Sequence, residues 1–233
     1  MRGKRKRHFL SFPRARAVSQ YVKFSCERAR AEITPFERFA ELNTCRRKLL
    51  ELQLIGVDST GISFGNLSVR DGATNNFYIT GSGTAGTTEL APADCPKVVA
   101  YDFERNWLRY EGSAIPSSES LTHAAIYQSD KKAGAVIHCH DSNLWAALVN
   151  KAPTTPRAAG YGTAEVAYEV MRLLDSSDVQ GRKILVMAGH EGGIVSFGRD
   201  LDEAFAVLTL ERKESSPCAG SRSHKDSSAP HDG

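Results

Sequence analysis

Apolar residues recur along this chain with two spacings, one typical of helices and one typical of strands. The helical spacing is clearest after Thr34, which is followed by Pro35 and, three positions on from Thr34, by Glu37, the pattern of a capped helix start. Gly56 can end the same segment. The apolar positions of this first predicted helix are Phe36, Phe39, Leu42, Leu49 and Leu52.

Short apolar runs separated by polar turns follow, and they predict strands. Residues 61–72 and 75–83 form a predicted hairpin, and residues 95–112 contain two further strands. Asp141 is expected to cap one later helix, and Thr163 is expected to start another. These later helices are predicted at residues 116–131, 141–150, 162–177 and 199–213, with strands at 133–140 and on both sides of the glycine-rich turn in 182–198. The alternation predicts an α/β domain with many hairpin-like connections.

Composition separates the 233-residue chain into one folded body and two polar ends. A hydrophobic share of 41% and a charged share of 24% are close to globular averages, so a packed core is expected. Residues 31–213 carry the predicted elements and suit a single domain. Residues 214–233 are polar and poor in hydrophobic side chains, which predicts a disordered tail. Residues 1–30 form a basic N-terminal arm.

The arm carries much of the positive excess of a chain whose formal net charge is +3. Residues 1–20 contain seven Lys or Arg and no acidic residue. Three interpretations fit this segment: a disordered solvated leader, a mitochondrial or plastid transit peptide, or a basic cluster for nuclear import or nucleic-acid binding. The body beyond the arm is near neutral or slightly acidic, so no nucleic-acid partner is expected for the domain.

The number and spacing of the cysteines and the hydropathy of the chain limit the cellular compartments in which we expect the protein. Five scattered cysteines without a Cys-x-x-Cys pair argue against a disulfide framework and against a cysteine-based zinc site, and they fit a reducing compartment. The basic start lacks the apolar segment of a secretory signal, and no apolar run approaches the ~18 residues of a membrane span. We therefore expect no membrane partner and a cytoplasmic location, or an organellar one if the arm is a transit peptide.

Two of the seven histidines, His138 and His140, stand two positions apart at the end of the predicted strand 133–140. Side chains alternate along a strand, so both imidazoles point to one face and Cys139 points to the other. On a helix the same two side chains would be about 200° apart. The strand geometry therefore allows both rings to bind one ion, although a pair taken alone also fits a polar strand end.

A third histidine, His190, lies beside glycines in the turn within residues 182–198. Three histidines with an open fourth position are the ligand set of a catalytic zinc, whereas a simple turn histidine is the alternative for His190. Glu119 stands in the first turn of the helix 116–131, where the helix dipole favours a carboxylate with or without a catalytic role. His123, four residues on, is expected to pack beside the site rather than to bind metal.

Two glycine- and serine-rich turns have the composition of anion sites. Gly65 and Asn66 stand in one turn with Ser68 nearby, and Ser82 stands between glycines in another, where backbone N–H groups suit a phosphate. A pair of serines, residues 117–118, precedes a helix and offers a third anion site. Each of these segments also fits an ordinary turn, so their significance depends on their occurring together.

The chain resembles the class II aldolase/adducin family in five ordered motifs: GNLSVR, YITGSGT, PSSES, AVIHCH and AGHEGG. The family's enzymes include L-fuculose-phosphate aldolase, L-ribulose-5-phosphate 4-epimerase and methylthioribulose-1-phosphate dehydratase. The resemblance covers about residues 36–212. It implies a three-layer α/β/α fold with a central, mainly antiparallel sheet flanked by helices. It also implies a homotetramer with active sites at subunit interfaces.

Carried over by position, the resemblance implies one Zn²⁺ per subunit, held by His138, His140 and His190, with Glu119 as the catalytic residue. The implied phosphate-binding residues are Gly65, Asn66, Ser82, Gly83, Ser117 and Ser118. The implied activity is a zinc-dependent, aldolase-type lyase that cleaves a phosphorylated keto-sugar through a metal-stabilised enediolate.

Other activities remain open within and outside this interpretation. A sugar-phosphate 4-epimerase or a methylthioribulose-phosphate-type dehydratase would use the same metal and glutamate, and a non-catalytic adducin-like interaction domain would share only the fold. Two positions depart from the family pattern. Tyr161 stands where the aldolase has a different aromatic residue, so the family's tyrosine acid is not matched. Glu191 follows His190 where glycine is more usual.

Overall fold

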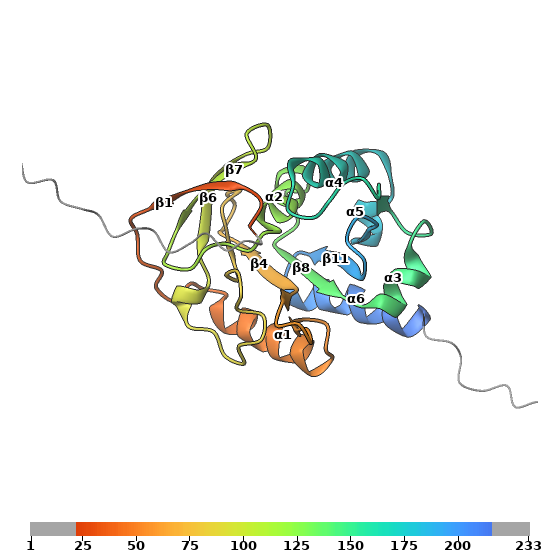
Figure 1. Ribbon diagram of the computed structural model, residues 1–233, viewed down its shortest axis with the longest axis horizontal. Helices are drawn as coiled ribbons and strands as arrows, with labels where there is room; N and C mark the ends of the chain where they lie inside the picture. The colour runs from red at the N-terminus through yellow and green to blue at the C-terminus, as the bar shows by residue number, and fades with distance from the viewer. Residues whose placement is uncertain (1–21, 216–233) are drawn as a thin grey trace, which may run out of the picture.

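Strands and helices alternate through the computed structural model of the protein, which describes residues 22–215 (Figure 1). The strands are β1 (Ser25–Ala29), β2 (Gly56–Val57), β3 (Ser63–Phe64), β4 (Asn66–Arg70), β5 (Phe77–Ile79), β6 (Lys97–Asp102), β7 (Trp107–Glu111), β8 (Ala135–His140), β9 (Thr154–Thr155), β10 (Ile184–Met187) and β11 (Gly193–Gly198). The helices are α1 (Phe39–Glu51), α2 (Ser120–Ser129), α3 (Ser142–Leu148), α4 (Ala164–Ser176), α5 (Val179–Arg182) and α6 (Leu201–Ser215).

Nine of the strands form one sheet in the order β1-β7-β6-β5-β4-β8-β11-β10-β9, while β2 and β3 pair separately. Pairing is antiparallel from β7 to β10, and only the edge strands β1 and β9 run parallel to their neighbours. Antiparallel neighbours suit the short hairpin connections that the sequence predicts. The predicted hairpin is confirmed as β4–β5, and the two further strands predicted in residues 95–112 are β6 and β7, which also pair as a hairpin.

Helices cover both faces of this sheet, which confirms the predicted three-layer α/β/α fold with a mainly antiparallel sheet. Residues of α2 and α4 pack with Val136 and Phe197 in one buried cluster. On the opposite face, α1, α3 and α6 pack with Ile137 and Cys139 in a second cluster. In Figure 1 these two helix layers lie above and below the sheet. The change of side between residues 136 and 137 follows from the alternation of side chains along β8.

The first helix begins later and ends earlier than the sequence predicts. It begins at Phe39, after Arg38, and not at Pro35. The reason is an aromatic contact. Phe36 stacks on Tyr78 of β5 with ring centroids 3.9 Å apart, and this contact keeps Phe36 and its neighbours outside the helix. At the other end, Gln53 adopts φ +56, which interrupts the helix. Gly56 consequently lies in β2 instead of ending the helix.

Several short or edge elements escaped the sequence pattern. Residues 25–29, which composition places in the arm, form β1 because they pair with β7. The strands β2, β3 and β9 have only two residues each, too few to show a period. The remainder of the predicted arm (1–21) and of the tail (216–233) lies outside the described residues. Within residues 22–215, no helix is both long and apolar enough to cross a membrane.

A buried arginine fixes the chain that leaves β5. Arg46, on α1, is 1% exposed, and its guanidinium donates hydrogen bonds of 2.8 Å to the carbonyl oxygens of Thr84 and Ala85 and another to that of Thr87. Its guanidinium therefore provides N–H donors for a row of carbonyl groups that are partly or fully buried. The segment held in this way directly follows residues 82–83.

Replacing this arginine tests how strongly it holds the segment. Arg46→Met is expected to lower the free energy of unfolding by about 2–4 kcal/mol, since it leaves buried carbonyl oxygens without a donor. Arg47→Met is the matched control: Arg47 is an exposed neighbour that pairs with Glu89, and its loss is expected to cost under about 1 kcal/mol. Urea unfolding followed by circular dichroism measures both variants, and equal losses would contradict the role given to Arg46.

Candidate active site

Strand β8 carries two of the three histidines and lies in the middle of the sheet. It is paired on both edges: His138 lies opposite Asn66 of β4 and Val195 of β11, and His140 lies opposite Gly193. The even-numbered side chains of β8 face the layer of α2 and α4, whereas Cys139 is buried in the cluster on the other face. The alternation expected from the sequence therefore holds, and both imidazoles lie on one side.

The third histidine, His190, comes from the turn between β10 and β11. The backbone N–H of His190 donates to the Met187 carbonyl at 3.1 Å, and the backbone carbonyl of His190 accepts from the Gly193 N–H at 2.8 Å. A side chain at Gly189 would not fit, because a Cβ there would lie 2.3 Å from the Ala159 carbonyl oxygen. Glycine thus allows this turn to approach the segment after β9, and the turn projects His190 toward β8.

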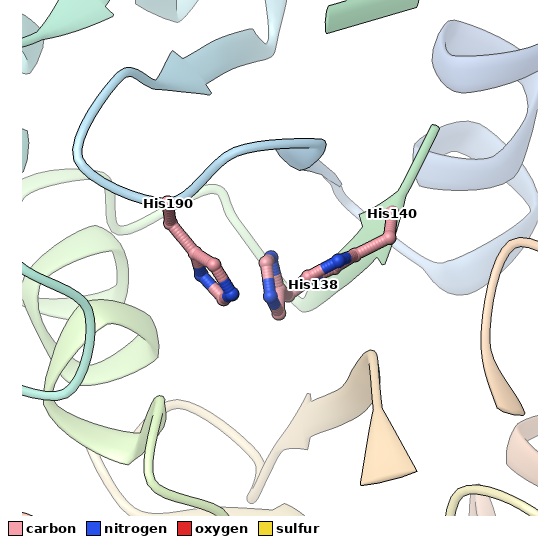
Figure 2. Close-up of side chains that lie close together, drawn as sticks. All are labelled: His138, His140 and His190. Carbon is pink, nitrogen blue, oxygen red and sulfur yellow. The ribbon is translucent and has the colours of Figure 1, made fainter. Parts of the chain in front are cut away.

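The three imidazoles point toward a common space (Figure 2). Their ring centroids are 5.2 Å apart for His138–His140, 5.1 Å for His138–His190 and 4.5 Å for His140–His190. One nitrogen from each ring can be chosen so that all three lie within 4.8 Å of one another. This spacing is close enough for the three residues to share one small cation.

The protonation of the rings suits the same role. His138 Nδ1 lies 3.2 Å from the carbonyl oxygen of Ile194, which can only accept, so Nδ1 carries the proton and Nε2 keeps its lone pair. Burial lowers the pKa of His140 to about 4 and that of His190 to about 3, and it lowers the pKa of His138 well below its usual value. All three rings are therefore neutral near pH 7, the form that binds metal.

Glu119 lies at the start of α2 and is 2% exposed. Its Oε2 accepts a 2.8 Å hydrogen bond from Thr122 Oγ1, and its Oε1 lies 3.6 Å from His190 Nδ1 without a hydrogen-bond partner in the described residues. Burial raises the pKa of the carboxyl to about 7, against the opposing effects of Thr122 and Lys23. A carboxyl in this state can both accept and release a proton.

A cavity of about 660 Å³ contains this cluster. The residues lining it include Glu119, the three histidines and all six residues predicted to bind phosphate: Gly65, Asn66, Ser82, Gly83, Ser117 and Ser118. Two of the turns are joined directly, since Gly81 and Pro116 form a β-bridge. The topology therefore brings together segments that are far apart in the sequence.

The donors offered by these turns differ in part from those expected. The N–H groups of Gly81 and Ser82 already donate to the carbonyls of Asp94 and Ile115, both at 2.8 Å. The predicted nest of exposed amides is thus wrong for these two residues, and Ser82 can offer its hydroxyl instead. Asn66 is 7% exposed, and its Oδ1 is buried without a partner in the described residues.

Further residues line the cavity that the sequence pattern did not single out as members of the site. Arg212 of α6 donates to Asp141 Oδ2 at 2.7 Å, next to His140. Tyr161, expected only as a departure from the family pattern, stacks on His190 with ring centroids 4.4 Å apart. No local motif could reveal these contacts, because each joins segments distant in sequence.

Two other residues considered from the sequence lie outside the histidine cluster. His123 is fully buried in α2, and its Nδ1 lies 2.7 Å from Ser68 Oγ. Glu191 is exposed to solvent. The cation site that the geometry allows therefore consists of three histidines with Glu119 beside them.

Comparison with known proteins bears on the family and the fold of the chain. The family model described as Class II Aldolase and Adducin N-terminal domain matches residues 52–212. A solved structure of L-fuculose 1-phosphate aldolase is 25% identical and covers 78% of this chain and 84% of its own, with a TM-score of 0.57. No curated protein matched in a search by sequence.

Two more distant structures share the fold. A sugar-phosphate aldolase from Thermotoga maritima is 16% identical, with 77% of this chain and 92% of its own covered and a TM-score of 0.58. The N-terminal class II aldolase domain of a conserved protein from Thermoplasma acidophilum is 16% identical, with 79% and 96% covered and a TM-score of 0.51.

The glycine at the cavity wall offers a test of this packing. Gly65 has φ +78, and a Cβ there would lie 2.4 Å from Ile55 Cγ2, so Gly65→Ala is expected to lower the free energy of unfolding by roughly 2–4 kcal/mol. Gly72 also has positive φ, +57, but open space around it, and Gly72→Ala should cost only about 1 kcal/mol. Thermal unfolding distinguishes the two, and an equal cost would show that the collision is absent.

Proposed function

The chain belongs to the class II aldolase and adducin family, and on this basis we propose that it is a zinc-dependent lyase that cleaves a carbon–carbon bond of a phosphorylated keto-sugar. One observation carries the proposal. Three neutral imidazoles each offer a nitrogen within 4.8 Å of the other two, and a buried carboxyl lies 3.6 Å from one of the rings in the same cavity. The likeness to L-fuculose 1-phosphate aldolase supports the choice of cleavage.

The metal would be held by His138, His140 and His190. Nitrogen ligands of this number and spacing suit Zn²⁺, and they leave a coordination position open for a substrate. Buried imidazole nitrogens of His140 and His190 have no partner among the described residues, which a bound cation would provide. When bound, zinc would supply a positive charge that stabilises the negative charge developing beside the substrate carbonyl.

Glu119 would move the proton. Its Oε1 lines the cavity without a partner, while the Thr122 hydroxyl holds Oε2 and thereby fixes the orientation of the carboxyl. A carboxyl fixed in this way beside the metal ligands can take a proton from a substrate hydroxyl or return one to carbon. Orientation of this kind reduces the entropy lost in reaching the transition state.

The phosphate would bind where the glycine- and serine-rich turns line the cavity. The Ser82 hydroxyl and the Asn66 amide face the same cavity as the residues that precede α2, where the helix dipole favours an anion. Arg212 adds a positive charge to the lining, although Asp141 pairs with it. Holding the phosphate end of the sugar would place its carbonyl near the histidines.

The other activities follow from the same site. A 4-epimerase or a dehydratase would share the histidines and Glu119, so only the products distinguish them from a lyase. A non-catalytic interaction domain has no need of buried polar atoms left without partners, since each costs about 1–3 kcal/mol. Assembly as a homotetramer and a location in the cytoplasm or an organelle complete the proposal.

Removal of one ligand tests the metal site. His138→Ala is expected to lower bound zinc from about one per chain to well below half, because two ligands hold the ion far less tightly than three. Cys139→Ala is the matched control, since this neighbour points into the opposite core and should leave zinc content unchanged. Elemental analysis of both purified variants measures the effect. Zinc content that is equal in His138→Ala and the wild type would remove this residue from the site.

A screen of phosphorylated keto-sugars tests the reaction. Zinc-loaded protein is incubated with fuculose, rhamnulose, ribulose and methylthioribulose phosphates, and cleavage, epimerisation and dehydration products are separated by chromatography. Cleavage of at least one substrate is expected. Glu119→Gln should bind zinc normally yet lose about 10²–10⁴-fold in kcat. A fully active Glu119→Gln variant would contradict its role, and epimerised or dehydrated products alone would replace the lyase with the corresponding alternative.

A further inference from the structure

Three side chains from separate parts of the chain form a stack at the edge of the histidine cluster. The Tyr161 ring lies on His190, with centroids 4.4 Å apart and planes inclined by 27°. The Lys23 ammonium lies 3.4 Å from the centroid of the Tyr161 ring. Lys23 precedes β1 and lies outside the residues 52–212 that match the family model. A segment beyond the family domain therefore reaches the candidate site.

The backbone around Lys23 is held in place. Its carbonyl oxygen accepts a 2.8 Å hydrogen bond from Asn106 Nδ2, and the next residue, Phe24, is buried in the core under α2 and α4. Ser25 N then donates to Asn106 O at 2.9 Å, where β1 begins its pairing with β7. Although its side chain is exposed, Lys23 therefore leaves the backbone from a fixed position.

The segment that carries Tyr161 is also closely packed. Gly162 has φ +70, and a Cβ there would lie 3.1 Å from the Ser118 carbonyl oxygen and 3.6 Å from Lys23 Cβ. Thr163 Oγ1 donates to the Gly160 carbonyl at 2.8 Å. The tyrosine ring is thus fixed by its own turn, with the lysine on one side and the imidazole on the other.

The imidazoles of His138 and His190 are held in place by different contacts. A metal-binding imidazole usually has its second nitrogen bonded, which fixes the plane of the ring. His138 has such a bond, from Nδ1 to the Ile194 carbonyl. Within residues 22–215, neither ring nitrogen of His190 makes a hydrogen bond, and Glu119 Oε1, at 3.6 Å from Nδ1, is too far away to accept one. Its ring must therefore be oriented by packing, and the nearest ring outside the histidine cluster is that of Tyr161.

We propose that Tyr161, held by the Lys23 ammonium, is a positioning residue that keeps the His190 imidazole oriented for a divalent cation. The inference rests on the metal site of the proposed function and adds two residues to it. The aromatic face provides the contact with His190, and the ammonium is attracted to the electron-rich face of the same ring. Lys23 is not among the residues that line the cavity, so it acts through the ring.

Direct electrostatic repulsion between Lys23 and the cation would change the zinc affinity in the opposite direction. A positive charge near the site repels a cation, so loss of Lys23 by this route would strengthen zinc binding. Loss of Lys23 through the stack would weaken zinc binding, and only while Tyr161 is present. The sign and the dependence on Tyr161 therefore separate the two effects.

Zinc affinity of the full-length protein, measured by competition with a chromophoric chelator, tests the proposal. Tyr161→Leu is expected to weaken zinc binding by about ten-fold or more, whereas Tyr161→Phe, which keeps the ring, should stay within about two-fold of the wild type. Lys23→Met should weaken binding by about three-fold, and Lys23→Arg, which keeps the cation, should restore it. Lys132→Met, at an exposed lysine on another part of the surface, is the control for charge.

Two further measurements separate positioning from general damage. In the Tyr161→Leu background, Lys23→Met should cause no additional loss, since its effect depends on the ring. The visible absorption of bound Co²⁺ should change in Tyr161→Leu and remain as in the wild type in Tyr161→Phe. Thermal unfolding in EDTA shows whether Tyr161→Leu folds. If it does not fold, the zinc affinities of the Lys23 variants and of Tyr161→Phe still test the proposal.

The possible results have distinct meanings. Wild-type affinity in Tyr161→Leu, or tighter binding in Lys23→Met, would overturn this proposal and leave the proposed function intact. A wild-type chain that binds neither Zn²⁺ nor Co²⁺ would overturn both. Equal, additive losses in both tyrosine backgrounds would show that Lys23 acts independently of the stack, which also contradicts the proposal.

Discussion

The register of strand β8 determines the geometry of the whole candidate site. Because β8 is hydrogen-bonded on both edges, to β4 and to β11, its histidines cannot shift by one residue without moving every neighbouring pair. A shift of one residue would also turn His138 and His140 toward α1 and α6, and Cys139 toward the cavity. The same pairing places Asn66 beside His138. It also places the turn that carries His190 directly before β11. The site is therefore a consequence of strand pairing in the centre of the sheet.

Polar atoms buried without partners gather around this point. Of the eight such side-chain atoms in the described residues, four line the cavity: Asn66 Oδ1, Glu119 Oε1, His140 Nε2 and His190 Nδ1. Each costs about 1–3 kcal/mol of stability unless something binds to it. The proposed function gives these atoms a cation and an anionic ligand as partners, and the low dielectric of a buried site would strengthen those charge interactions.

Features of the fold and of the candidate site that depend on local pattern could be predicted from the sequence. Features that depend on tertiary contacts could not. Alternation along β8 predicted that His138 and His140 share a face, and Asp141 caps α3 as expected, with Oδ1 accepting from Leu144 at 3.0 Å. The first helix was misplaced because the Phe36–Tyr78 stack outweighs a local capping pattern. The positions of Lys23 over Tyr161 and of Arg212 beside Asp141 depend on how distant segments pack, and no spacing in the sequence encodes them.

X-ray absorption at the zinc edge tests the central claim most directly, because it reports the atoms bound to the metal in the intact protein. The account predicts three histidine nitrogens at about 2.0–2.1 Å, one oxygen ligand and no sulfur neighbour. A sulfur shell at about 2.3 Å, or a spectrum of hydrated zinc without the multiple scattering of imidazole rings, would contradict it.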